Sequence, residues 1–253
     1  MTDIQLPNRP HSEATKVEQS RAVAEVAAAV KVAREFPRSV DRARSEMSAL
    51  CNSLAVANRA FYEVPNRGSG LSVHIARELA RIWGNIDYGV RELHRDDANG
   101  ISEMQAWAWD QETNVRSTRS FIQPHDRMVK GSRKRLTDLG DIYLNNQNTA
   151  ARAVRECIFT VLPGWLLADA EDALRATLKG GGGQSIEMRR AGAIEKFADI
   201  GVTQKQLETR ANKPASKWDA NDLAGLIRVY MSITQEGMPA QDYFPEKPVE
   251  VQP

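Results

Sequence analysis

Cationic side chains gather in one stretch of this chain, between residues 116 and 135. They are Arg116, Arg119, Arg127, Lys130, Arg133, Lys134 and Arg135. Only Asp126 opposes them, so the stretch carries a local charge of +6, although the whole chain has a formal net charge of +1. Such a concentration of cations suits a polyanion backbone, because each phosphate that is neutralised releases condensed counterions. A solvated basic loop without a ligand explains the same charges about as well.

The stretch before it, residues 87–112, is acidic. Seven carboxylates stand there against two arginines, which leaves a local charge of −5. Carboxylates on neighbouring strands can hold a divalent ion, so Asp87 and Glu103, with the downstream Lys130, form a candidate site for a metal-dependent nuclease. Acids that alternate with apolar residues are more often the solvated face of a sheet, and we favour that interpretation.

Flat rings and polar side chains near the basic stretch complete a candidate nucleic-acid surface. The rings are Trp107, Trp109 and Phe121, and the helix-like segment that follows adds Asn145, Asn146, Asn148, Arg152 and Arg155. Stacking surfaces beside a positive track bind single-stranded nucleic acid without sequence preference. The alternatives are core packing for the tryptophans and an exposed helix flank for the arginines.

The sequence shows no catalytic or cofactor signature. It lacks a nucleophile elbow, a zinc-protease motif and a nucleotide-binding loop, and its four histidines have no ligand spacing. Cys51 and Cys157 lie in helix-like patterns and are expected as buried free thiols in a reducing compartment. We therefore expect a protein that is not an enzyme, with no cofactor and no metal.

Membrane association is not expected either. The chain has no run of about 18 apolar residues. Its first residues lack the basic and then apolar pattern of a signal peptide. These patterns predict a cytoplasmic protein without a membrane partner.

Two hydrophobic periods divide the chain into helices and strands. A period of 3.6 predicts helices over 17–36, 39–62, 72–83, 141–162 and 164–178. A period of 2 predicts strands over 86–91, 101–109 and 115–122, which short turns join into an antiparallel meander. Residues 64–70 and the basic segment 124–139 are expected as loops. The expected fold is α+β: a small three-stranded meander packed with several helices and followed by a small C-terminal helical bundle.

The same periods predict which side chains share a face. Arg116 and Arg119 are an odd number of residues apart, so they should point to opposite faces of their strand and cannot both touch one ligand there. Asn148, Arg152 and Arg155 fall on one stripe of the helix over 141–162. The neighbouring stripe is expected in the core and contains Tyr143, Ala150, Ala151, Val154, Cys157, Ile158 and Val161.

Composition divides the chain into five segments. Residues 1–16 are polar and expected to be disordered, and residues 17–178 form the expected DNA-binding core. The glycine tract within residues 179–184 predicts a flexible linker. Residues 185–237 predict a small helical accessory domain, in which Thr203 and Asp219 cap helices, and residues 238–253 a loose tail.

The segment between the basic stretch and the linker resembles a known family. It reads LTDLGDIYLNNQNTAARAVRECIFTVLP, with an acidic start, small residues, a basic pair and a leucine–proline end. This order resembles the signature region of the RecT/Red-beta superfamily of phage single-strand annealing proteins. The matching positions are Asp138, Asp141, Ala150, Ala151, Arg152, Arg155, Leu162 and Pro163. The resemblance covers roughly residues 17–178, and the departures around residues 83–110 indicate a divergent member.

The resemblance implies an ATP-independent protein that binds single-stranded DNA and anneals complementary strands through a duplex intermediate. It also implies homo-oligomers, as rings or helical filaments, and work beside a phage exonuclease or a host single-strand binding protein in the bacterial cytoplasm. The phosphate contacts that it implies are Arg127, Lys130, Arg133, Lys134, Arg135, Arg152 and Arg155. The alanine-rich helix over 17–36 would serve oligomerisation or pack within the molecule. A metal-dependent nuclease of a phage or mobile element, and a phage structural protein, are the alternatives.

Overall fold

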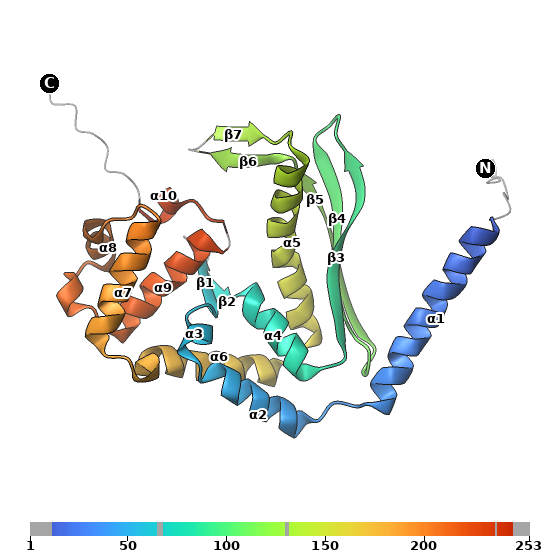
Figure 1. Cartoon of the computed structure of the whole chain (residues 1–253), viewed down its shortest axis with the longest axis horizontal. Helices are drawn as coiled ribbons and strands as arrows, with labels where there is room; N and C mark the ends of the chain where they lie inside the picture. The colour runs from blue at the N-terminus through green and yellow to red at the C-terminus, as the bar shows by residue number, and fades with distance from the viewer. Residues whose placement is uncertain (1–11, 65–67, 130–131, 236, 245–253) are drawn as a thin grey trace, which may run out of the picture.

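The computed structural model describes residues 12–64, 68–129, 132–235 and 237–244 (Figure 1). Its centre is the predicted antiparallel meander, formed by β3 (Ile86–Asp96), β4 (Ile101–Asp110) and β5 (Val115–Pro124). Helices pack against this sheet and form a separate cluster at the C-terminal end. The α+β fold class is therefore confirmed.

Alternation along β4 gives the sheet one covered and one open face. Met104, Ala106 and Ala108 are buried, whereas the residues between them keep more solvent exposure. The helix α5 (Leu139–Val161) lies against the covered face, where the Cys157 thiol approaches the Ala106 carbonyl oxygen at 3.7 Å. A single helix layer therefore buries one side of the meander and leaves the other to solvent.

The long helix α5 begins two residues before the predicted start. The Asp138 side chain caps it by accepting a hydrogen bond from the Asp141 backbone N–H at 3.0 Å. Most of the predicted core stripe is buried, but Tyr143 is 57% exposed, so that part of the prediction is wrong. Ile142 takes the inward position instead, because one residue rotates a helix by about 100°.

Three more helices complete the main core: α2 (Val40–Cys51), α4 (Val73–Trp83) and α6 (Gly164–Gly180). Trp83 of α4 meets Trp165 of α6 edge to face, with ring centroids 5.7 Å apart. Cys51 and Cys157 both lie in this core as free buried thiols, as expected.

The predicted helix over 39–62 is wrong in its second half. It ends at Cys51, and the chain continues through the short α3 (Leu54–Ala57) into a hairpin of β1 (Phe61–Val64) and β2 (Gly68–Leu71). The hairpin also replaces most of the loop expected over 64–70, of which residues 65–67 lie outside the described part. Glycines suggested a loop, but Gly70 is needed in a strand because the Tyr62 ring lies over it, 3.3 Å from where a Cβ would stand.

The basic segment is a hairpin and not the expected loop. Its strands are β6 (Asp126–Val129) and β7 (Ser132–Arg135), which pair in antiparallel register. The two residues that join them, including Lys130, lie outside the described part of the chain. Neither strand alternates apolar with polar residues, so there was no period of 2 to detect.

The C-terminal helices form the expected small bundle: α7 (Ile186–Asp199), α8 (Gln204–Ala211), α9 (Ala220–Thr234) and α10 (Ala240–Tyr243). Phe197, Trp218 and Leu223 lie at its core. Thr203 and Asp219 cap α8 and α9 with reciprocal capping boxes, which confirms both predicted caps.

The glycine tract is a compact turn in this structure and not an extended tether. The helix α6 continues to Gly180, and Gly181, with a φ of 73°, ends it in the left-handed conformation that favours glycine. Gly182 packs against α3, since a Cβ there would lie 2.7 Å from the Leu54 side chain. The bundle is also bonded to β1: the Ser232 hydroxyl accepts from the Glu63 backbone N–H at 2.7 Å, and the Tyr243 hydroxyl donates to the Glu63 carbonyl.

Both predicted loose ends contain structure. Residues 240–244 carry α10 and the buried side chains of Tyr243 and Phe244, so the tail is ordered at least to residue 244. At the other end, α1 (Glu13–Glu35) starts within the segment expected to be disordered, capped by Ser12. Residues 1–11 and 245–253 lie outside the described part.

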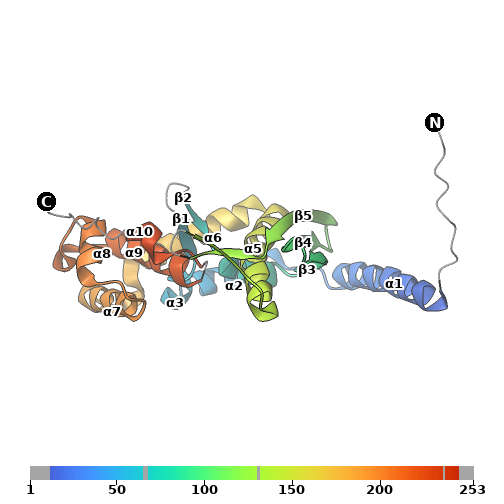
Figure 2. The ribbon, with the colours of Figure 1, turned by 90° about the horizontal axis from the view of Figure 1, so that it is seen from above.

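The helix α1 projects from the body of the molecule. Figures 1 and 2 both show it extending beyond the meander, at the end of the molecule opposite the C-terminal bundle. Within it, only Ala33 is buried. Within the described ranges, no helix combines the length and apolarity that a membrane crossing requires.

Candidate nucleic-acid interface

The basic hairpin presents two cations side by side on one of its faces. Arg127 of β6 pairs across the strands with Lys134 of β7, and both side chains are exposed. Directly opposed residues of antiparallel strands have their Cβ atoms about 5 Å apart. Among the described residues, neither cation has an ion-pair partner.

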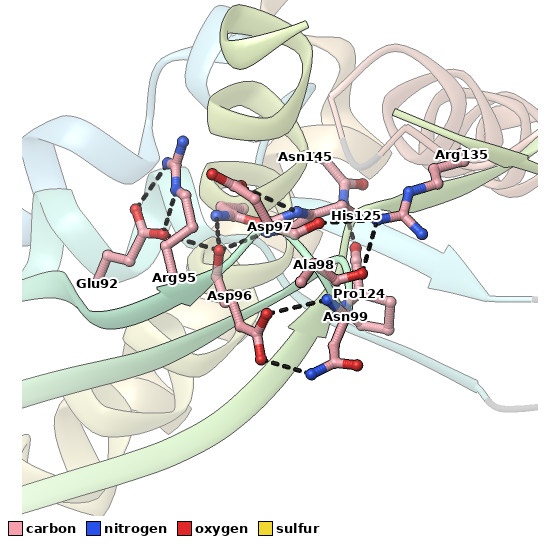
Figure 3. Close-up of polar contacts among 12 residues, drawn as sticks. Glu92, Arg95, Asp96, Asp97, Ala98, Asn99, Pro124, His125, Arg135 and Asn145 are labelled. Carbon is pink, nitrogen blue, oxygen red and sulfur yellow. Dashed lines mark hydrogen bonds and ion pairs between the residues drawn. The ribbon is translucent and has the colours of Figure 1, made fainter. Parts of the chain in front are cut away.

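The other face of the hairpin is partly used by the protein itself. Arg133 is exposed and lies 3.5 Å from the Asp126 carboxylate. Arg135 points back to the turn between β3 and β4, where its guanidinium donates to the Asp97 carbonyl at 2.9 Å (Figure 3). It also lies against Gly100, where an added Cβ atom would stand only 2.9 Å from the guanidinium. Arg135 was expected as a phosphate contact, but in this conformation its guanidinium attaches β7 to the turn between β3 and β4.

A buried polar network fixes the base of the hairpin. Ser102 is fully buried, and its hydroxyl lies 2.7 Å from His125 Nε2 and 3.0 Å from the Asn146 amide nitrogen. The backbone of His125 donates to the Gly100 carbonyl at 2.7 Å and accepts from the Leu136 N–H at 2.8 Å. These hydrogen bonds therefore attach both hairpin strands to the place where β3, β4, β5 and α5 meet.

The hydrogen bonds of this network can be assigned from the Ser102 hydroxyl. It has one proton, which it donates to Glu92 Oε1 at 2.8 Å, so it must accept from both Asn146 and His125. His125 then carries a proton on Nε2. A hydrogen bond from Arg95 is the main reason that the pKa of Glu92 lies below its ordinary value, so this acceptor stays ionised (Figure 3).

In the same network a serine contacts a histidine, and the histidine in turn lies near an aspartate. His125 Nδ1 lies 3.9 Å from Asp97 Oδ1, on the ring side away from Ser102. Ser102 is nevertheless 0% exposed and donates its proton to Glu92. No substrate reaches that hydroxyl in this conformation, and the group is structural.

The predicted polar stripe of α5 faces away from the sheet. Asn148 and Arg152 are exposed, and the Arg152 guanidinium approaches the Met238 sulfur at 3.7 Å, just before α10. Arg155 is buried, with its guanidinium stacked 4.3 Å from the Tyr62 ring of β1. It is therefore not on an exposed flank. Its Nε donates to Glu156, while its buried Nη1 finds no acceptor among the described residues.

The neighbouring asparagines are used within the protein. Asn146 is buried in the network described above, and the Asn145 amide donates to the Pro124 carbonyl at 3.0 Å. Both were expected as candidates for phosphate or base contacts. In this structure they attach α5 to the end of β5 instead.

The two tryptophans lie on the open face of the sheet, on the side opposite α5. The Trp107 indole donates to Asp87 Oδ2 at 2.7 Å and lies flat over Gly89, where a Cβ would approach the ring at 2.7 Å. The Arg91 guanidinium stacks on Trp107 at 4.5 Å. Arg91 was missed by the sequence reasoning, although a glycine two residues before it in a strand was a signal that a ring crosses there.

Trp109 lies on the same open face and contacts other residues than Trp107 does. Its indole donates to the Asn114 side chain at 3.1 Å, and Arg116 lies directly across the strands from it. These rings and cations form a mixed surface together with the acids Asp87 and Glu103. Within the described residues, no three His, Cys, Asp or Glu side chains are grouped so that they could hold a metal ion.

The remaining predicted residues lie on the covered side of the sheet. Arg119 pairs with Ala106 and Phe121 with Met104, both of which face α5. Arg116 and Arg119 therefore point to opposite faces, as the pleat predicted. Phe121 cannot share a stacking surface with Trp107 and Trp109, so that grouping is wrong.

The predicted contacts thus fall into two surfaces on opposite sides of the meander. The hairpin cations and the α5 stripe lie on the side of α5, and the tryptophans with Arg116 on the open face. A hollow of about 510 Å³ lies between α3, α7 and α9 and is lined by none of these residues.

Comparison with known proteins adds no relative to this picture. No protein-family model matches the chain, and no curated protein or solved structure is significantly similar to it.

Proposed function

We propose that this protein binds single-stranded DNA and anneals complementary strands without ATP. The observation that carries the proposal is the exposed cation pair of Arg127 and Lys134, held on a hairpin whose base is fixed by a buried network. The resemblance of the segment over 136–163 to phage annealing proteins points to the same function. Arg133, on the other face of the hairpin, and the α5 residues Asn148 and Arg152 are further candidate contacts.

The mechanism follows from charge. Cations that hold the phosphate backbone lower the repulsion between two strands and release counterions, so the strands approach without any bond being broken. Contacts to phosphate do not read sequence, and the base edges remain free to pair. Arg155 and Arg135 support this surface through packing and positioning, since their guanidinium groups are already engaged with the protein.

The proposal includes the partners that the resemblance implies. These are single-stranded DNA, the annealed duplex intermediate, further copies of the chain in a ring or filament, and a phage exonuclease or host single-strand binding protein in the bacterial cytoplasm. The duplex intermediate would occupy the same phosphate contacts, because annealing leaves both backbones outside the base pairs.

Charge reversal of the hairpin pair tests the proposal. The variant Arg127→Glu/Lys134→Glu should bind a single-stranded oligonucleotide at least about tenfold more weakly, since a hydrogen bond to a charged group contributes about 1.5–3 kcal/mol. The slope of log affinity against log salt should fall by about 1.4, because two phosphates are no longer neutralised. The matched control Lys179→Glu/Lys205→Glu makes the same charge change at exposed residues of α6 and α8.

Equal losses of affinity in both double variants would show that only net charge matters and would refute the site. An annealing assay with complementary oligonucleotides completes the test, because annealing must fail in the hairpin variant. Shortening of labelled DNA in magnesium or manganese would favour the nuclease alternative. No binding of the wild type even at low salt would favour a structural role.

A further inference from the structure

His125 is a buried titratable side chain that the proposed function does not use. Its side chain is only 2% exposed, yet a carboxylate lies on each side of its ring. On one side Nε2 lies 2.7 Å from the Ser102 hydroxyl, which is bonded in turn to Glu92. On the other side Nδ1 lies 3.9 Å from the Asp97 carboxylate (Figure 3). The ring is therefore placed where a positive charge on it would meet an acid.

Only one ring nitrogen of His125 can change its proton in this network. The Ser102 hydroxyl donates to Glu92 and accepts from His125, so Nε2 keeps its proton whether the ring is charged or neutral. Glu92 stays ionised, because the hydrogen bond from Arg95 holds its pKa below the ordinary value. The nitrogen that gains or loses a proton is therefore Nδ1, which is the one that faces Asp97.

Asp97 connects this nitrogen to the basic hairpin. Its carboxylate is 70% exposed, so it has room to move toward the ring or away from it. Its carbonyl oxygen accepts from the Arg135 guanidinium of β7 at 2.9 Å, and the Ala98 carbonyl lies 3.5 Å from the same guanidinium nitrogen. The backbone N–H of His125 donates to the Gly100 carbonyl at the end of the same turn. The turn between β3 and β4 is thus held by both His125 and β7.

The other groups around His125 come from each element that meets at this junction. They are the ion pairs Glu92–Arg95 and Asp126–Arg133, the cation Arg135, and the uncharged Ser102 and Asn146. Arginines keep their charge throughout, and each of the two paired acids is held by one of them. Asp97 is therefore the acid that a charge on His125 can attract. A second histidine, His94, is exposed on β3 and serves as a control below.

We propose that a proton on His125 Nδ1 fastens the basic hairpin and that loss of this proton releases Arg135. The imidazolium attracts the Asp97 carboxylate and draws the turn onto the ring, whereas the lone pair of the neutral nitrogen repels it. A fixed turn keeps the Asp97 carbonyl in place for Arg135. Once the turn loosens, Arg135 loses this acceptor and becomes a further cation on the hairpin. Histidine changes its charge between about pH 5 and 8, so the device responds to pH in that range.

Nitrogen-15 NMR of the histidine rings gives the first test. The neutral ring of His125 should carry its proton on Nε2, and acidification should add a proton to Nδ1 alone. His125→Gln identifies the signals of this ring among those of the four histidines. A neutral ring with its proton on Nδ1, or a ring whose charge does not change between about pH 5 and 8, would overturn the proposal.

Hydrogen exchange of the β6 and β7 amides gives a second test that needs no DNA. Protection, relative to an unfolded chain at the same pH, should fall roughly two- to fivefold from about pH 5.5 to pH 8, the size of one exposed ion pair. Asp97→Asn should remove this fall, whereas Asp172→Asn, which deletes the same charge on exposed α6, should keep it. His94→Gln should keep it as well. An Asp97→Asn variant that responds to pH like the wild type would refute the coupling.

The salt dependence of DNA binding tests the consequence for Arg135, and this part alone rests on the proposed function. One added phosphate contact at about pH 8 should steepen the slope of log affinity against log salt by about 0.7 relative to pH 5.5. Arg135→Gln should abolish the difference, and a difference that survives in this variant would refute the release of Arg135. A hairpin that responds to pH without any DNA binding would count against the proposed function only. DNA binding through Arg127 and Lys134 without a pH response of the hairpin would count against this inference only.

Discussion

Ser102 is the residue whose loss should show most clearly how the hairpin is held. In Ser102→Ala, His125 Nε2 and the Asn146 amide lose their common acceptor in the core, while Glu92 keeps its hydrogen bond from Arg95. A buried polar group left without a partner costs about 1–3 kcal/mol. Two such groups give an expected loss of about 3 kcal/mol in the free energy of unfolding.

Urea denaturation measures this loss, with Ser120→Ala as the matched control. Ser120 lies on exposed β5, and its hydroxyl only meets the Gln105 amide at 3.4 Å, so its removal should change stability by less than about 0.5 kcal/mol. The Ser102 variant should also bind DNA more weakly under native conditions, since the hairpin base is loosened. A stability within about 0.5 kcal/mol of the control would refute the assignment of hydrogen bonds in the network.

Three further outcomes follow from other contacts. Arg38→Met removes the ion-pair partner of the buried Asp110 carboxylate, which keeps only the backbone N–H groups of Glu112 and Thr113 as donors. The change should cost about 3–5 kcal/mol in a thermal or urea melt, and a loss under about 1 kcal/mol would contradict this. The pKa of Glu92 is lower in the folded protein than its ordinary value of 4.5, so the ionised carboxylate stabilises the fold above pH 4.5, and this stabilisation is lost as the pH falls through the folded pKa. The difference in the free energy of unfolding between wild type and Glu92→Gln should therefore narrow below about pH 4.5. A difference that stays constant with pH would contradict this prediction. Gly89→Val should displace the Trp107 indole, with a red-shifted and altered tryptophan emission; an unchanged spectrum would show that the ring does not lie over this strand.

Elements with a strong hydrophobic period were predictable from the sequence. The meander and α5 were recognised because alternation runs through each of the segments 86–91, 101–109 and 115–122, and helical spacing through 141–162. The two short hairpins were not, since four-residue strands without alternation depend on distant contacts. The β6–β7 hairpin, for example, is held by His125 against Gly100 and by Arg135 against the β3–β4 turn.

The candidate site was predictable in its residue types and less so in its grouping. The pleat alone separated Arg116 from Arg119, because that argument needs only their spacing. It could not place Phe121 relative to the tryptophans without the register between β4 and β5. Burial of Arg155 was also hidden, because the Tyr62 ring that covers it comes from a hairpin taken for helix and loop.

The division into two surfaces bears on how annealing would proceed. The meander separates Trp107 and Trp109 from the cations of Arg127 and Lys134, so one nucleotide cannot contact both in the same copy. One face of the Trp107 ring lies on Gly89, and the Arg91 guanidinium stacks on the ring as well, so a base would have to displace an arginine to stack there. Under the proposed function, strands are then held by phosphate contacts alone on the α5 side. That arrangement leaves bases unstacked by protein and ready to pair, which is the condition annealing needs and which a strong stacking platform would oppose.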